Sequence, residues 1–68
     1  MEFDLKGKEY IELNKLLKLM NLVESGGMAK MVIDEGLVMV NGEIEQRIRN
    51  KIKSGFKVEF EGQTVLVK

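Results

Sequence analysis

Apolar residues recur at helical spacing in two stretches of the first half of the chain. The first stripe has separations of three, four and seven positions and consists of Leu13, Leu16, Leu17 and Met20. The second stretch runs from about Gly26 to Glu35, and its expected inward positions are Met28, Ala29, Val32 and Ile33. Each pattern predicts an amphipathic helix. Because only residues 21 to 24 separate them, the two helices are expected to form a hairpin.

The pattern changes after Gly36 to alternation of apolar and other residues, which is typical of strands. The expected strands centre on Val38 and Val40, on Val58 and Phe60, on Thr64 to Val67 and on Met1 to Leu5, the last as a short edge strand. Neither helix can bury its stripe alone, so these strands must form the other layer of the core. The sequence predicts one α+β domain over residues 1–68, with a two-helix hairpin packed on a small, mainly antiparallel sheet.

Residues that start, stop or turn elements stand at the boundaries of this pattern. Ser25 is a favoured helix N-cap, and Gly36 supplies the left-handed residue that commonly follows a helix. Asn41-Gly42 is the preferred pair for a type I′ hairpin turn, and Glu61-Gly62 can turn the chain again. These local signals agree with the periodicity.

The composition narrows the chemistry that the chain can perform. It contains neither Cys nor His, which excludes disulfides and thiolate metal sites and removes the commonest metal ligand and neutral-pH base. The adjacent acids Asp34 and Glu35 point in different directions at a helix end, and Ser25 has no base to activate it. We expect no cofactor, no metal and no enzymatic activity. With no apolar run approaching the ~20 residues of a membrane span, we expect a cytoplasmic protein.

The formal net charge is zero, but the cations are concentrated in one segment. Residues 47 to 57 contain no acid, and their cations all occupy odd positions: Arg47, Arg49, Lys51, Lys53 and Lys57. In an extended chain, odd positions share one face, while Ile48 and Ile52 take the other. Like-facing residues ~6.6 Å apart match the spacing of nucleic-acid phosphates, so the stripe is a candidate phosphate-binding surface. The alternative is an edge strand that is charged to prevent aggregation.

A second candidate anion site lies at the start of the second helix. Ser25, Gly26 and Gly27 would leave free amides and the positive end of the helix dipole open to a phosphate, and Lys30 lies one turn further on. A glycine pair is also an ordinary way to make a turn. Lys15 and Lys18 share an outer face of the first helix, which either is merely solvated or meets a ligand.

The methionines and the aromatic residues bear on the core and on the kind of RNA that the chain could recognise. The four methionines expected to fill gaps in the core are Met20, Met28, Met31 and Met39. Aromatic side chains are few, and Phe60 alternates inward, which disfavours recognition of single strands by stacking. Recognition of folded RNA by shape and phosphates is favoured instead.

The ordered set of motifs resembles the ribosomal-protein S-four-type RNA-binding domain, also called the alpha-L motif. The second helix and its strand match at Ala29, Lys30, Ile33, Gly36, Val38, Val40, Asn41 and Gly42, the first helix at Leu13 to Met20, and the closing strand at Ile52, Gly55, Val58 and Phe60. The short chain, SG-x-x-AK and R-x-R-x-KI together resemble the stand-alone bacterial YbcJ-type group. The resemblance covers roughly residues 9 to 67. Many larger members have an arginine where this chain has Gly26, so that RNA contact cannot be carried over.

This resemblance implies a non-enzymatic module that binds structured RNA, with ribosomal RNA or an assembling ribosomal subunit as its partner. The expected RNA-binding residues are Lys15, Lys18, Ser25, Gly26, Gly27, Lys30, Arg47, Arg49, Lys51 and Lys53. Two other functions stay open: a small protein-interaction module whose charges only keep it soluble, and an RNA-binding subunit that serves an RNA-modifying enzyme in trans. We expect the protein to be a monomer.

Overall fold

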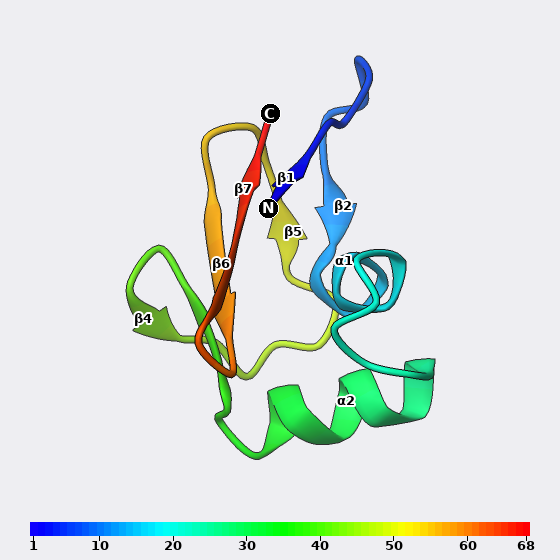
Figure 1. Ribbon diagram of the computed structural model, residues 1–68, viewed down its shortest axis with the longest axis vertical. Helices are drawn as coiled ribbons and strands as arrows, with labels where there is room; N and C mark the ends of the chain where they lie inside the picture. Colours follow the sequence, from blue (N-terminus) through cyan, green and yellow to red (C-terminus); the bar gives the residue numbers. More distant parts are fainter.

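The computed structural model describes all residues 1–68, and its main sheet has five strands. In chain order the elements are β1 (Glu2–Phe3), β2 (Ile11–Glu12), α1 (Leu13–Leu19), α2 (Gly26–Asp34), β3 (Val38–Val40), β4 (Glu43–Ile44), β5 (Lys51–Ile52), β6 (Lys57–Phe60) and β7 (Gln63–Val67). The sheet order is β1-β7-β6-β3-β4, and β2 pairs with β5 in a separate two-stranded ladder. Only β1 runs parallel to its neighbour. The predicted α+β architecture is confirmed (Figure 1).

The core lies between one face of the sheet and the helical hairpin. Alternate residues of β3, β6 and β7 are buried, and they meet the apolar stripes of the two helices. The stripe on α1 consists of Leu13, Leu16 and Leu17, and the stripe on α2 consists of Ala29, Val32 and Ile33. Ile52 is fully buried in the same cluster and anchors β5 to it. Neither helix is long and apolar enough to cross a membrane.

The predicted boundaries of α2 and of the hairpin turns are confirmed. The Ser25 hydroxyl accepts a hydrogen bond of 3.1 Å from the Met28 amide, as an N-cap does. Gly36 ends the helix with φ +76°, and the next amide, that of Leu37, donates back to the Val32 carbonyl. At the β3–β4 turn, Asn41 and Gly42 have φ 53° and 86°, as a type I′ turn requires.

The start of α1 is capped by a segment distant in the sequence. Glu12 stands at the N-cap position, but its side chain makes no capping hydrogen bond. Instead the Leu13 amide donates to the Asn50 carbonyl at 2.9 Å, and the Asn14 amide donates to the Ile48 carbonyl at 3.1 Å. The loop that carries Arg47 and Arg49 is therefore held directly against the first turn of α1.

Two predictions about side chains and local structure are wrong. Met28, Met31 and Met39 do not fill the core. Met28 and Met31 are 40% and 50% exposed, because α2 buries only its Ala29, Val32 and Ile33 stripe, and Met39 points away from the core because it alternates with the buried Val38 and Val40. Residues 47 to 57 do not form one extended stretch either. The chain turns at residues 47–50 and again at 53–56, where the amides of Asn50 and Phe56 donate back three residues, and only β5 between the turns is a strand.

Candidate nucleic-acid interface

The start of α2 and the loop before β5 enclose a hollow of about 480 Å³, which we call the α2 hollow. Its lining residues are Asn14, Gly26, Lys30, Ile48 and Arg49. Three of these were predicted from two separate segments of the sequence, and the fold brings them to one opening. The hydrogen bond between the Asn14 amide and the Ile48 carbonyl closes this side, since it ties the loop to α1, which packs on α2.

The cations at the α2 hollow are free to meet a ligand. Lys30 and Arg49 are exposed and take part in no ion pair within the protein. The amides of Gly26 and Gly27 have no hydrogen-bond partner in the chain, because the helix begins there and the Ser25 hydroxyl accepts only from Met28. Two free cations and two free amides thus converge on one concave site.

Gly26 leaves room at this opening. A Cβ built on Gly26 would meet no atom within 4 Å, so an anion can approach the helix end without a side chain in its way. The same space would accommodate the arginine that larger members of the resembling family have here. Packing around residue 26 therefore does not explain why this chain has glycine rather than arginine there.

Arg47, which was predicted to bind RNA, is hydrogen-bonded within the protein. Its Nε and Nη2 donate to the two oxygens of Glu45 at 2.9 and 3.0 Å, and its backbone amide donates to Oε2 at 3.0 Å. Asn50 Nδ2 adds a fourth hydrogen bond to Glu45 at 3.1 Å. This cluster, which we call the Glu45 anchor, fixes the shape of the loop that places Arg49.

The electrostatics of the Glu45 anchor follow from these contacts. The side-chain hydrogen bonds from Arg47 lower the pKa of Glu45, partly opposed by burial of the carboxylate, and Glu45 in turn raises the pKa of Arg47. Both groups stay charged near neutrality. Sequence reasoning missed Glu45, although an acid two residues before an arginine at a loop was a visible signal.

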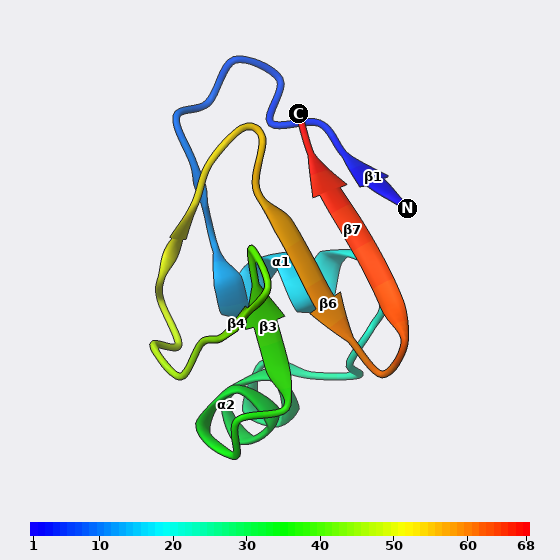
Figure 2. The same ribbon diagram turned by 90° about the vertical axis from the view of Figure 1, so that its left-hand side faces the viewer.

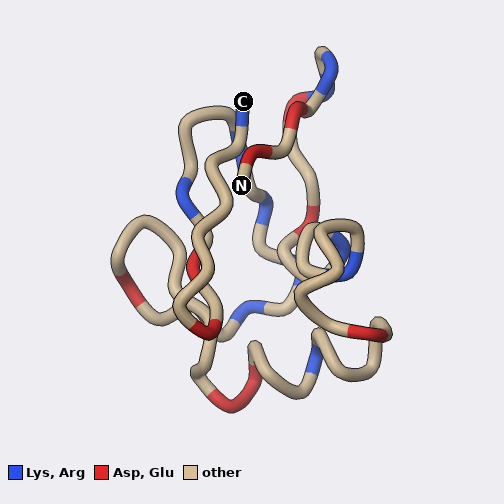
Figure 3. The backbone as a smooth tube through the Cα atoms, viewed as in Figure 1, with Lys and Arg blue, Asp and Glu red and all other residues tan.

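The remaining lysines lie around the hollow rather than in it. Lys18 and Lys53 are exposed without an ion-pair partner, whereas Lys15 lies 3.5 Å from the Glu12 carboxylate. The Lys51 ammonium lies 5.1 Å from the centre of the Tyr10 ring, a cation–π contact that sequence reasoning did not foresee. Figure 3 shows blue positions on α1, on α2 and along the β5 segment, all on the side of the molecule that carries the helical hairpin.

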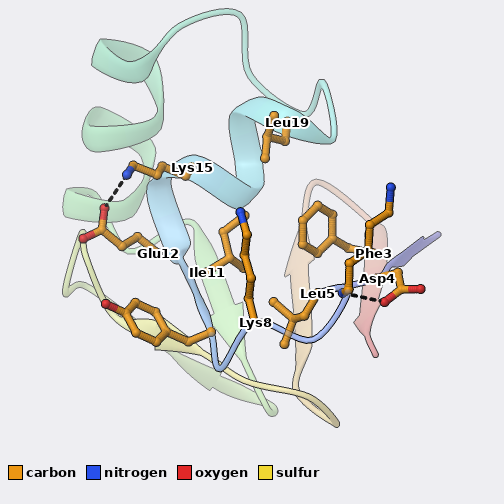
Figure 4. Close-up of a pocket in the computed structure, with 10 residues that line it drawn as sticks. Phe3, Asp4, Leu5, Lys8, Ile11, Glu12, Lys15 and Leu19 are labelled. Atoms are coloured by element: carbon orange, nitrogen blue, oxygen red, sulfur yellow. Dashed lines mark hydrogen bonds and ion pairs between the residues drawn. The ribbon is translucent and has the colours of Figure 1, made fainter.

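Lys15 lines a separate groove of about 480 Å³ between the N-terminal segment and α1. Figure 4 shows apolar Leu5, Ile11 and Leu19 along it, with the ammonium groups of Lys8 and Lys15 at its rim. Tyr10 also lines this groove, so Lys51 stands beside it. Of the predicted basic residues, Lys15 lines this groove and Lys30 and Arg49 line the α2 hollow, and only the α2 hollow lies at a helix start with free amides.

Comparisons with known proteins agree with the motifs found in the sequence. The family model described as the S4 domain matches residues 3–68. YbcJ of Escherichia coli (strain K12), named as a candidate RNA-binding protein, is 46% identical over 65 residues, which are 96% of this chain and 93% of the relative. RlbA of Bacillus subtilis (strain 168), named as a probable ribosome maturation protein, is 44% identical over 54 residues, which are 79% of this chain and 76% of the relative.

A solved structure extends the comparison to three dimensions. The solution structure of YbcJ from E. coli, described as revealing an alphaL motif involved in RNA binding, superimposes with a TM-score of 0.75. It has 45% sequence identity and covers 97% of this chain and 84% of that chain. The resemblance inferred from the motifs is confirmed: the chain belongs to the S4 domain family, with the fold of its YbcJ members.

Proposed function

We propose that this protein is a non-enzymatic RNA-binding module that grips the phosphate backbone of structured RNA at the α2 hollow. One observation carries the proposal: the fold brings Lys30, Arg49 and the free amides of α2 to a single opening. No other predicted cations lie in a hollow beside a helix start with free amides. The names of YbcJ and RlbA and the description of the YbcJ structure support the same reading.

Each group at the hollow suits a phosphate in its own way. The Arg49 guanidinium can donate two parallel hydrogen bonds to one phosphate, while the Lys30 ammonium acts as a mobile point charge. The helix amides add oriented donors and the positive end of the dipole. None of these contacts reads a base, so the module would select RNA by the shape that presents its phosphates.

The free lysines around the hollow would extend the contact along the backbone. Lys18 on α1 and Lys53 after β5 are exposed and unpaired, so both can add point charges beyond the opening. Four phosphate contacts, from Lys18, Lys30, Arg49 and Lys53, would give a slope of log affinity against log salt of about −3. Arg47 is left out of this count because Glu45 already holds it.

We further propose that the RNA is ribosomal and is bound in an assembling subunit. The support is the similarity to RlbA, named for ribosome maturation, at 44% identity. Crosslinking in the source organism, followed by sequencing of the bound RNA, tests this. Ribosomal RNA should be enriched over transfer and messenger RNA, and the enrichment should be lost in the Lys30→Ala/Arg49→Ala variant. Enrichment of another RNA class would contradict this part of the proposal alone.

Filter binding of total cellular RNA across a salt series tests the RNA-binding role itself. The Lys30→Ala/Arg49→Ala variant should flatten the slope by about 1.4 to 1.8, which is two contacts at 0.7 to 0.9 each. Lys57→Ala/Lys68→Ala is the matched control, because it removes the same charge from residues that are paired with Glu59 and Glu2 on the sheet. Equal effects of the two variants would remove the α2 hollow as the binding site. No salt-dependent affinity at all would favour a protein-interaction module.

A further inference from the structure

The main sheet has a second face that no helix covers. Since Val58 and Phe60 on β6 are buried against the hairpin, the residue between them, Glu59, points to the opposite side. Its cross-strand neighbour on β3 is Met39, whose own neighbour on β4 is Ile44. Figure 2 shows this side of the sheet, with β3, β4 and β6 standing in front of α1. We call it the outer face.

The outer face exposes large apolar side chains. Ile44 is 65% exposed, Leu37 is 53% exposed and Leu66, which alternates with two buried valines of β7, is 46% exposed. Leu37 lies two residues before Met39 and so shares its side of the strand. Ile44 also reaches the end of α2, where its Cγ2 lies 3.5 Å from the position that a Cβ on Gly36 would take. The apolar side chains thus continue from the sheet to the helix end.

Acidic residues border this apolar surface at the end of α2. Residues 31 to 46 contain four acids and no Lys or Arg. Asp34 and Glu35 end α2 beside Leu37, and neither is in an ion pair, whereas Glu43 pairs with the buried Val40 and so lies on the other side of β4 from Ile44. The negative end of the α2 dipole adds to the negative field. Figure 3 shows the red positions of this stretch at the end of α2 and on the β3–β4 hairpin.

The cations on this side are neutralised. Lys57 on β6 lies 3.7 Å from the carboxylate of Glu59, and Lys68 lies 3.0 Å from that of Glu2. The outer face therefore carries unpaired acids at the end of α2, while Lys57 and Lys68 are paired. RNA would be repelled from the outer face. A symmetric contact between two copies is also disfavoured, because it would bring the same acidic residues of both copies together.

We propose that the outer face is a docking surface for a segment of another protein in which apolar side chains are flanked by Lys or Arg. The apolar side chains of the partner would cover Leu37, Ile44 and Leu66, and its cations would pair with Asp34 and Glu35. The surface lies across the sheet from the helical hairpin, so this protein can hold RNA and the partner at the same time. The proposal uses none of the residues proposed for RNA and stands without that function.

Titration of the ¹⁵N-labelled protein with two synthetic peptides, monitored by amide chemical shifts, tests this docking surface. The first is an amphipathic Leu/Lys peptide of roughly four helical turns, and the second has every Lys replaced by Glu. The Leu/Lys peptide should give saturable shifts centred on Leu37, Ile44 and Leu66, and the Leu/Glu peptide should give none. No saturable shifts, equal binding of both peptides, or shifts centred on Lys30 and Arg49 would overturn the proposal.

Matched variants separate local from overall charge. Asp34→Lys/Glu35→Lys should weaken binding of the Leu/Lys peptide by about tenfold or more. Glu9→Lys/Glu24→Lys changes the net charge equally at exposed acids elsewhere and should weaken it far less. Leu37→Ser/Ile44→Ser should abolish binding, whereas Leu19→Ser, at a residue 62% exposed on α1, should not. Equal effects in either pair, or self-association through Ile44 in sedimentation, would overturn the proposed occupant. The amide spectrum itself shows that each variant is folded.

Discussion

The Arg47 guanidinium is bound by the Glu45 carboxylate through two hydrogen bonds, of 2.9 and 3.0 Å, while Arg49 has no ion-pair partner. Two arginines that look equivalent in the sequence therefore differ in what they can offer a ligand. Arg47→Ala should change the salt slope of RNA binding by less than half as much as Arg49→Ala, for which about 0.7 to 0.9 is expected. Filter binding of both variants over the same salt series decides this, and equal slopes would show that RNA displaces Glu45 from Arg47.

The Glu45 anchor also predicts a pH dependence of stability. Arg47 lowers the pKa of Glu45 in the folded protein. The ionised carboxylate therefore stabilises the fold at pH values above 4.5, which is the ordinary pKa of this group. That contribution should be lost as the pH falls from about 4.5 through the lowered folded pKa. Urea unfolding should show Glu45→Gln less stable than the wild-type protein at pH 7, with the difference shrinking in acid. A difference that is constant with pH would mean that the charge of Glu45 contributes nothing.

Two glycines at opposite ends of α2 should respond differently to alanine. Gly36 has φ +76°, so Gly36→Ala should destabilise the fold by about 1 to 2 kcal/mol. Gly26 has a helical backbone and free space at its Cβ, so Gly26→Ala should change stability by less than about 1 kcal/mol. Thermal unfolding of the two variants measures this contrast. Similar losses at both positions would contradict the assignment of Gly36 as the left-handed residue after the helix.

Gly26 offers a test in which binding is gained rather than lost. The free space at its Cβ should accept an arginine, whose guanidinium would lie beside the α2 hollow. Gly26→Arg should therefore tighten RNA binding and steepen the salt slope by about 0.7 to 0.9. Lys57→Arg is a suitable control, because it places a guanidinium on the sheet without adding charge. Weaker binding by Gly26→Arg would show that RNA needs the open backbone at this position.

The elements that could be predicted from the sequence are those whose signals are local. The stretch from Ser25 to Gly42 contains a cap, a helix stop and a turn pair, and all three have the predicted geometry. The strand of residues 57 to 60 could also be predicted, because a strand with one buried face has apolar residues at every second position. Three of the lining residues of the α2 hollow were also foreseen: Gly26, Lys30 and Arg49.

What could not be predicted depends on contacts between distant segments. The exposed Arg47 and Arg49 flank the partly buried Ile48 in a turn just as they would in a strand, so periodicity could not distinguish the two. Which side of α2 is buried depends on where the sheet ends, and Met31 lies outside that contact. The parallel pairing of β1 with β7 likewise joins the two ends of the chain.

The capping of α1 by distant carbonyls has a consequence for how the protein is made. A helix of seven residues without a side-chain cap is not stable alone in water. Its first two amides are bonded to Ile48 and Asn50, so the helix can be completed only after the chain has been synthesised past residue 50. The nine residues of α2 are likewise too few for a stable isolated helix, and α1 folds together with the loop that carries Arg49. The helix and the α2 hollow therefore arise in the same step.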